Sequence, residues 1–204
     1  MVCEGYSDAC FISALLDHKG VEEYQVGCPT SDSVGGEGKD KIPKYLEALA
    51  TNKTGLRGIL VLVDADDKPK TVFDAMAKAL ENATFPAPTK PFSIEGTNLF
   101  RVAVFMIPRD GSTGTLEDIL WEAAVQKDNE VKICVEEFAS CTGQMSKWKP
   151  NKQAKMRMHS TIAAYCEENP SCSLAWIWSQ KGNPVPIDST RFDHISKFLA
   201  EFIA

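Results

Sequence analysis

Residues 59–67 read Ile-Leu-Val-Leu-Val-Asp-Ala-Asp-Asp, and this stretch decides the fold class. Its first five residues are a continuous aliphatic run rich in β-branched side chains, which is typical of a strand that helices cover on both faces. The run ends abruptly at Asp64, Asp66 and Asp67. Ligands of an open parallel sheet bind beyond the carboxyl ends of its strands. The stretch therefore predicts a parallel α/β sheet with acidic side chains at its ligand-binding edge.

The segments around this strand alternate between strand and helix patterns. Apolar runs at residues 1–3 and 100–107 predict further strands, and residues 21–26 alternate weakly, as a strand does. Apolar residues at helical spacing mark residues 11–16, 42–49, 72–80 and 116–123. This alternation predicts an α/β fold with a central, mostly parallel four-stranded sheet flanked by helices.

The last third of the chain has a mainly helical pattern. Helical periodicity marks residues 131–139, 152–165 and 189–202, whereas residues 174–178 are compatible with a late strand or a buried turn of helix. We therefore expect a catalytic core over residues 1–125 and a mainly helical extension over residues 126–204 that packs on it.

Composition limits the class of protein. The chain has 204 residues and a formal net charge of -6, so its overall field does not indicate nucleic-acid binding, although a metal site is itself acidic and its basic contacts can be local. Its seven cysteines include no C-x-x-C pair, which predicts buried, reduced thiols. No apolar run has membrane-spanning length. We expect a cytoplasmic protein without membrane contact.

Acidic residues follow two of the predicted strands. Glu4 comes directly after the first strand, and Asp64 and Asp66 follow the central one. If these strands are neighbours, the three carboxylates converge and raise one another's pKa unless a cation neutralises them. Oxygen ligands of this kind suit Mg²⁺ or Mn²⁺. The alternative is structural, because Asp66 or Asp67 could simply cap the next helix.

These motifs resemble those of a known family. Glu4-Gly5 followed by Ser7-Asp8, and later the Val-Asp-Ala-Asp-Asp of residues 63–67, resemble the TOPRIM domain of topoisomerases, bacterial primases and OLD-family nucleases. The spacing of Glu4 and Asp8 is similar to the OLD-like branch, and residues 111–118 look like the small stand-alone TOPRIM proteins. The resemblance covers roughly residues 1–120 and implies that the α/β fold is of the Rossmann-like TOPRIM type.

The resemblance implies a role for each matching residue. Glu4 would be a metal ligand or the general acid/base beside the metal, and Asp64 and Asp66 would be metal ligands. Asp8 would complete a first or second metal site, and Glu117 would add a carboxylate. The implied activity is that of a Mg²⁺-dependent (or Mn²⁺-dependent) nuclease or related phosphoryl-transfer enzyme, acting on DNA rather than RNA, in defence against foreign DNA.

The resemblance also leaves an alternative open. OLD nucleases carry an ATPase domain, whereas this sequence has no G-x-x-x-x-G-K-[ST] loop, so an ATPase would be a separate partner. The chain could then be a non-enzymatic TOPRIM subunit that binds nucleic acid or a nucleotide and works only with that partner. A homo-oligomer is compatible with either interpretation.

Basic residues supply candidate phosphate contacts. Lys152, Lys155 and Arg157 fall on one predicted helix, either as a phosphate-contacting patch or as an ordinary solvated face. We expect Lys155 near the metal, where it would stabilise developing charge and complete a catalytic set with Glu4, Asp64 and Asp66. Lys39, in a glycine-rich loop, and Arg109, at a strand end, are further candidates.

Overall fold

The central sheet agrees with the sequence pattern. The computed structural model describes residues 1–97, 99–108 and 112–204. The sheet has the order β1-β2-β4-β3 and is formed by β1 (Val2–Cys3), β2 (Gly58–Asp64), β3 (Glu95–Thr97) and β4 (Phe100–Ile107). Strands β1, β2 and β4 are parallel, and β3 is antiparallel to β4. The predicted α/β fold with a mostly parallel four-stranded sheet is confirmed.

One member of the sheet differs from the expectation. Residues 21–26 form no strand, and only the next residue, Gly27, makes an isolated bridge to Val2. The apolar residues among 21–26 pack partly buried against the core without pairing. The remaining strand is instead β3, whose Glu-Gly-Thr sequence carries no apolar pattern. It forms where the chain turns back along β4, and a Cβ on Gly96 would lie 2.2 Å from the Phe100 carbonyl oxygen, so the close approach requires glycine there.

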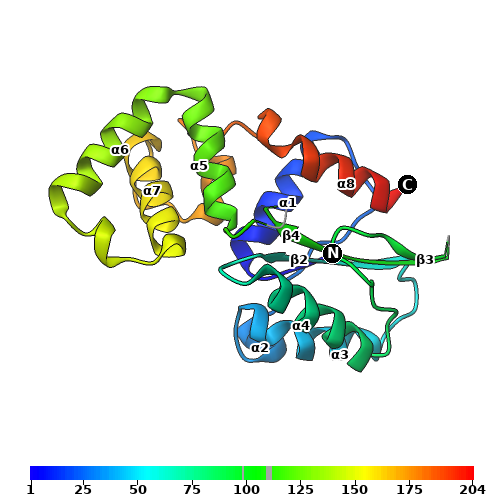
Figure 1. Cartoon of the computed structure of the whole chain (residues 1–204). Coiled ribbons are helices and arrows are strands. Elements are labelled where there is room, and N and C mark those ends of the chain that lie inside the picture. Colours follow the sequence, from blue (N-terminus) through cyan, green and yellow to red (C-terminus); the bar gives the residue numbers. More distant parts are fainter. Residues whose placement is uncertain (98, 109–111) are drawn as a thin grey trace.

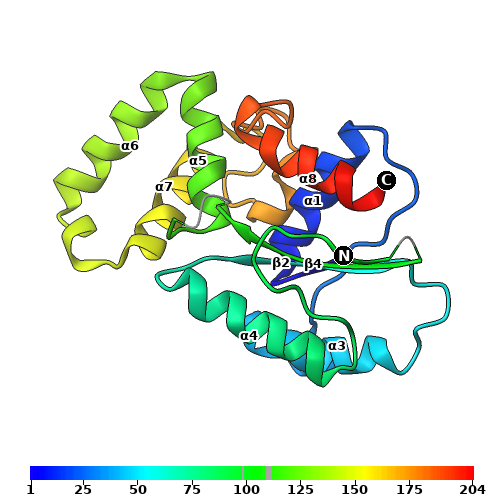
Figure 2. The same ribbon diagram turned by 45° about the vertical axis from the view of Figure 1, so that its right-hand side comes forward.

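Helices cover both faces of the sheet (Figures 1 and 2). On one face, α3 (Ile42–Ala50) and α4 (Pro69–Asn82) bury Val61 and Val63. On the other, α1 (Tyr6–His18) and α8 (Asp193–Ile203) lie over Leu62. Because successive side chains of a strand point to opposite faces, β2 must be apolar throughout.

Three helices form a lobe at the carboxyl-terminal end of the strands (Figure 1). The lobe consists of α5 (Leu116–Lys127), α6 (Asn129–Thr142) and α7 (Pro150–Tyr165), which pack against one another. Buried residues of α5 and α7 belong to the same apolar cluster as α1 and β2. The expected boundary at residue 125 lies inside α5, and a division of the chain there stays a prediction.

Short helices complete the chain. The stretch 174–178, for which a strand or a helical turn was open, is part of the 3₁₀ helix η3. The short elements are α2 (Ser31–Val34), η1 (Lys39–Lys41), η2 (Met145–Lys147), η3 (Leu174–Ser179) and η4 (Thr190–Phe192). In the described part of the chain, no helix has both the length and the apolar character needed to cross a bilayer.

The seven cysteines are free thiols. Four of them are buried, as expected: Cys3, Cys28, Cys166 and Cys172. Cys10 is partly buried, and Cys134 and Cys141 on α6 are exposed, so the expectation of buried thiols is wrong for these two. Both lie on the exposed surface of α6. The helical spacing of apolar residues in the sequence does not show which of the cysteines are buried.

Candidate functional site

The parallel pairing brings Glu4 and Asp64 to one edge of the sheet. Cys3 is paired with Leu62, and Asp64 is paired with Ile107 of β4. Glu4 follows Cys3 and Asp64 ends β2, so the two acidic residues leave adjacent strands at nearly the same level. The expected neighbourhood of the two strand ends is therefore present.

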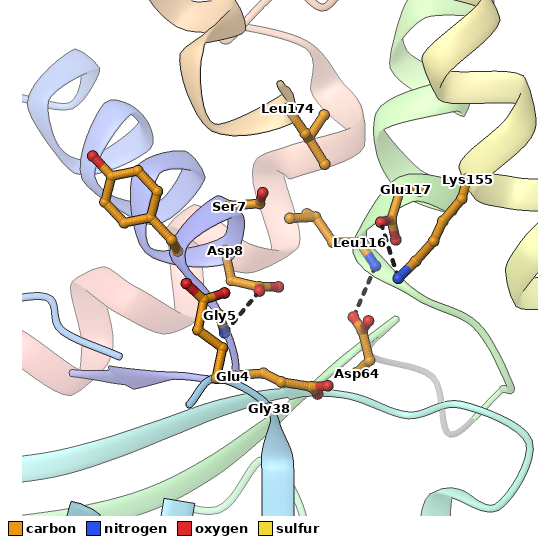
Figure 3. A pocket seen from close by; sticks show the side chains of 12 residues that line it. Glu4, Gly5, Ser7, Asp8, Gly38, Asp64, Leu116, Glu117, Lys155 and Leu174 are labelled. Carbon is orange, nitrogen blue, oxygen red and sulfur yellow. Dashed lines mark hydrogen bonds and ion pairs between the residues drawn. The ribbon is translucent and has the colours of Figure 1, made fainter. Parts of the chain in front are cut away.

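A pocket of about 300 Å³ opens at this edge. Figure 3 shows Asp8 and Asp64 directed into the same space, with Glu117 and Lys155 on the side opposite α1. Carboxylates from five separate segments line the pocket, together with one lysine: Glu4, Asp8, Glu37, Asp64, Glu117 and Lys155. The pocket is thus strongly acidic and has a cation on one wall.

Asp64 is held by the helix that follows β4. The backbone N–H of Leu116, in the first turn of α5, donates a 2.8 Å hydrogen bond to Asp64 Oδ1. The positive end of the helix dipole favours a carboxylate at this point. Burial nevertheless raises the pKa of Asp64 well above its usual range, and the nearby carboxylates, of which Asp8 has the largest effect, raise it further. Asp64 is therefore a buried carboxylate with little to neutralise it.

Asp8 reaches the pocket from the first turn of α1. Its Oδ2 accepts a 3.1 Å hydrogen bond from the Gly5 N–H, which closes a capping-box contact at the start of the helix. Burial raises the pKa of Asp8 to about 7, and the charges of Glu4 and Glu117 contribute to the shift. The expected proximity of Asp8 to the other carboxylates is thus present, and its cap fixes the side chain at the site.

Lys39 lies among the acidic residues rather than on the surface. Its ammonium pairs with Asp66, lies 3.5 Å from Glu4 Oε2 and donates a 3.2 Å hydrogen bond to the Asp64 carbonyl oxygen. Gly38 holds the loop in place, because its N–H donates to the Glu4 carbonyl oxygen at 3.1 Å. Its φ of 108° is one that a side chain rarely adopts. Lys39, which the sequence predicts as a phosphate contact, therefore balances the charges of Glu4 and Asp66 within the folded protein.

Asp66 takes a different position from the one its spacing indicates. An extended chain would direct Asp66 to the same side as Asp64, but Asp66 has a φ of 49° and makes a two-hydrogen-bond bridge with Gly114. Asp66 is not among the described residues that line the pocket, and its carboxylate pairs with Lys39. Strand β2 ends at Asp64, two residues before Asp66, so the extended geometry on which the prediction of paired ligands depended does not reach Asp66.

Glu4 lacks a hydrogen-bonding partner for one oxygen. Its Oε2 is buried and accepts no hydrogen bond, and the ion pair with Lys39 is its polar contact. Burial raises the pKa of Glu4, and the charge of Lys39 partly offsets this. An unpartnered buried acceptor is costly, so this oxygen is suited to a further cationic ligand.

The carboxylate oxygens of the pocket are chemically suited to Mg²⁺ or Mn²⁺, but they lie too far apart to coordinate one ion together. Carboxylate oxygens are the preferred ligands of these hard cations. Among residues 1–97, 99–108 and 112–204, no three His, Cys, Asp or Glu side chains are spaced to hold a metal ion together. A metal at this site would require the carboxylates of Glu4, Asp8, Asp64 and Glu117 to move closer.

The predicted basic residues are divided between several places. Lys155 lies at the pocket, 3.8 Å from Glu117. Arg157 instead pairs with Glu136 at 2.8 Å inside the lobe, and Lys152 is exposed on α7 outside the pocket lining. Arg109 lies outside the described residues. The structure thus brings Lys39 and Lys155 to the site.

Glu37 is a pocket residue that the sequence reasoning missed. It belongs to the glycine-rich loop, which was interpreted only for its lysine. A Cβ added to Gly5 would lie 3.3 Å from Glu37 Oε2, so this carboxylate packs over the chain between β1 and α1. The sequence pointed to Glu37 only through its position two residues before Lys39. Its contact with Gly5 arises only when the loop folds.

Comparison with known proteins identifies the family and no more. No curated protein and no solved structure matches the chain significantly. The TOPRIM relationship that the motifs suggest is therefore not established by these comparisons. The profile of DUF3226, described as a protein of unknown function, matches residues 1–203, which include the sheet, the pocket and the lobe. The chain therefore belongs to the DUF3226 family.

Proposed function

We propose that this protein is a Mg²⁺- or Mn²⁺-dependent nuclease, or a related phosphoryl-transfer enzyme, that acts on phosphodiesters of nucleic acid. One observation carries the proposal: Glu4, Asp8, Asp64 and Glu117 line one pocket at the carboxyl ends of parallel strands. Burial and mutual repulsion raise the pKa of both Asp8 and Asp64. A divalent cation is the ligand that would remove this repulsion.

The same four carboxylates would hold the metal. When bound, Mg²⁺ or Mn²⁺ supplies Lewis-acid polarisation of a phosphoryl oxygen and an activated water. Lys39 would have to release Glu4, because its ammonium lies 3.5 Å from the oxygen that needs a partner. Asp66 would then retain Lys39 at the edge of the site and act as a positioning residue.

Side chains of the protein are suited to the proton transfer and the stabilisation of phosphate charge that hydrolysis requires. A water oxygen attacks phosphorus, its proton passes to a base, and the bond from phosphorus to the leaving sugar oxygen breaks, while that oxygen takes up a proton from solvent. If Asp8, Asp64 and Glu117 hold the metal without Glu4, Glu4 is suited to be that base, because burial raises the pKa of its carboxyl and so makes the carboxylate a better proton acceptor. Lys155, whose side chain is 57% exposed beside Glu117, is suited to contact a non-bridging phosphate oxygen.

The remaining parts of the proposal rest on the resemblance to OLD-like TOPRIM proteins. They are a TOPRIM relationship, DNA rather than RNA as substrate, a role in defence against foreign DNA and a separate ATPase partner. A cytoplasmic location is supported by the free thiols, because a reducing compartment keeps cysteines in this state.

A non-enzymatic subunit is the second candidate. It would bind nucleic acid or a nucleotide and work only with a partner such as an ATPase. Lys39 favours it, because a lysine that already pairs with Glu4 and Asp66 neutralises two of the carboxylates without a metal. The two candidates differ in partner dependence: a subunit of this kind cuts nothing alone, whatever metal is added.

The test is cleavage by the purified protein. Supercoiled, linear and single-stranded DNA and RNA are incubated with Mg²⁺ or Mn²⁺, and the same substrates are given to Asp64→Asn and Asp74→Asn. Asparagine at position 64 keeps an acceptor for the Leu116 N–H and removes the charge. Asp74 is a matched control, since it pairs with Lys70 on the surface of α4.

We expect cleavage by the wild type and by Asp74→Asn, with a loss of at least about 100-fold in Asp64→Asn, as for removal of a group that acts in the transition state. Equal cleavage by Asp64→Asn would contradict the proposal. Failure of the wild type to cut any substrate, followed by cleavage when a partner ATPase is added, would favour the second candidate.

A further inference from the structure

Two exposed aromatic side chains lie together beside the pocket. The rings of Tyr6 and Trp176 have their centroids 6.4 Å apart at an interplanar angle of 61°. Tyr6 is 46% exposed and Trp176 is 57% exposed. Within η3, Ala175 and Ile177 on either side are buried, so Trp176 is the residue that this segment presents outward. Single exposed apolar side chains are common on protein surfaces, and it is the contact between these two rings beside the pocket that distinguishes them.

Tyr6 connects the pair to the acidic pocket, whereas Trp176 contacts Tyr6 and is not among the residues that line it. Tyr6 lines the pocket at the start of α1, and Leu174, in the same 3₁₀ helix as Trp176, lines it as well. Figure 3 shows Glu117 and Lys155 on the side of the pocket opposite α1, the helix that begins with Tyr6. A strand that places a phosphate among the carboxylates would therefore bring a neighbouring base to Tyr6 and Trp176.

We propose that Tyr6 and Trp176 form a stacking platform for an unpaired base, so that the pocket takes single-stranded nucleic acid. This inference rests on the proposed action on phosphodiesters. A base stacks on an aromatic ring whatever its sequence, because every base has a π-face. In a duplex the faces of the bases are already stacked on one another, so only an unpaired strand or a frayed end can use the platform.

The charge of the protein weighs against duplex binding. Duplex binding depends mainly on lysine and arginine contacts to phosphates. This chain has a net charge of -6, and its pocket is lined by carboxylates with Lys155 as their cation. An unpaired strand would depend on Lys155 and Lys39 for its phosphates and on stacking for the rest of its affinity.

The experiment separates binding from cleavage. An end-labelled oligothymidylate and a matched duplex are titrated with the Asp64→Asn protein, and binding is followed by fluorescence anisotropy. Trp176→Ala and Trp176→Phe are introduced into this protein, and Phe138→Ala serves as a control. Phe138 is an aromatic residue on α6 with 53% exposure, outside the pocket lining. Light scattering reports the oligomeric state of each variant.

We expect Trp176→Ala to weaken binding of the single strand by about 10-fold or more, as loss of one stacked base does, without changing duplex binding. Trp176→Phe should retain most of the affinity, and Phe138→Ala all of it. Unchanged affinity in Trp176→Ala, an equal loss for duplex, or a change of oligomeric state would overturn the platform.

These outcomes are distinct from failure of the proposed enzyme. Cleavage by the wild type together with unaltered binding in Trp176→Ala would remove the platform and leave the nuclease. Trp176-dependent binding of the single strand without cleavage would support the platform and contradict the nuclease. If the protein neither binds nor cuts any oligonucleotide, both proposals are wrong.

Discussion

The N–H of Leu116 donates a hydrogen bond to Asp64 Oδ1, so the last residue of β2 is fastened to the first residue of α5. This contact joins the sheet to the lobe at the pocket. It also lowers the pKa of Asp64, against burial and the three nearby carboxylates, which together raise that pKa well above its usual range. Four expectations follow from how this acidic site is arranged.

Divalent metal should stabilise the folded protein through Asp64. Because binding to the native state alone raises stability by about 2.7 kcal/mol at 100 times Kd, Mn²⁺ or Mg²⁺ should raise Tm by roughly 5–10 °C for a chain of this size. Asp64→Asn should lose this response, and Asp74→Asn should keep it. Thermal unfolding followed by circular dichroism, with KCl matched for ionic strength, measures it. An equal rise in Asp64→Asn would exclude Asp64 as a ligand.

Stability without metal should fall as pH rises, because of Asp8. The Asp8 carboxyl has a pKa of about 7 in the folded protein and an ordinary value of 3.8. Between these values the folded state binds the proton that the unfolded state has lost, so the free energy of unfolding decreases from about pH 4 to about pH 7 and then levels off.

Asp8→Asn should reduce that slope and leave the part that comes from the raised pKa values of Asp64 and Glu4. Asparagine keeps an oxygen for the Gly5 N–H, so the cap is retained while the charge is lost. We expect the variant to be more stable than the wild type by about 1–3 kcal/mol near pH 8, and nearly equal to it near pH 4. Urea unfolding with EDTA at several pH values tests this. A wild-type stability that rises from pH 4 to pH 7 in parallel with the variant would disprove the assignment.

Removing Lys39 should destabilise the metal-free protein. Its ammonium, about a quarter exposed, is the counter-charge for Glu4 and Asp66. Lys39→Met should lower the free energy of unfolding by about 1–2 kcal/mol near neutral pH, because it leaves partly buried carboxylates unpaired. Lys70→Met, which breaks an exposed pair with Asp74, should change it little.

A double-mutant cycle identifies the partner. In the Asp66→Asn background, Lys39→Met should cost less than it does in the wild type, because the pair has already been broken. Additive effects of the two substitutions in urea unfolding would show that Lys39 and Asp66 do not stabilise one another.

Gly38→Ala should disturb the site more than an ordinary glycine substitution. Gly38 has a φ of 108°, and an added Cβ would lie 3.0 Å from Asp40 Oδ1. We expect a loss of about 1–3 kcal/mol and a weaker metal response, because the loop carries Lys39. Gly143→Ala is the control: its φ is also positive, at 63°, but a Cβ there meets nothing within 4 Å. Denaturation and metal titration should therefore separate the two variants.

The sequence by itself determined the sheet and part of the site. A continuous apolar run such as residues 59–63 is stable only with both faces covered, and it ends at the edge where Asp64 lies. Glu4 follows from a local rule, since it comes directly after a strand, whereas Asp8 was expected from the similarity of the Glu4–Asp8 spacing to OLD-like TOPRIM proteins. These features depend on residues close together in the chain.

Only the tertiary structure decided which carboxylates share the pocket. Asp66 turns toward Lys39 because its positive φ and its bridge to Gly114 end the extended geometry. Glu37 joins the pocket because its loop folds back over Gly5. Such contacts join segments that are distant in the chain, and they arise from packing and electrostatics. No local pattern of residue types predicts these contacts.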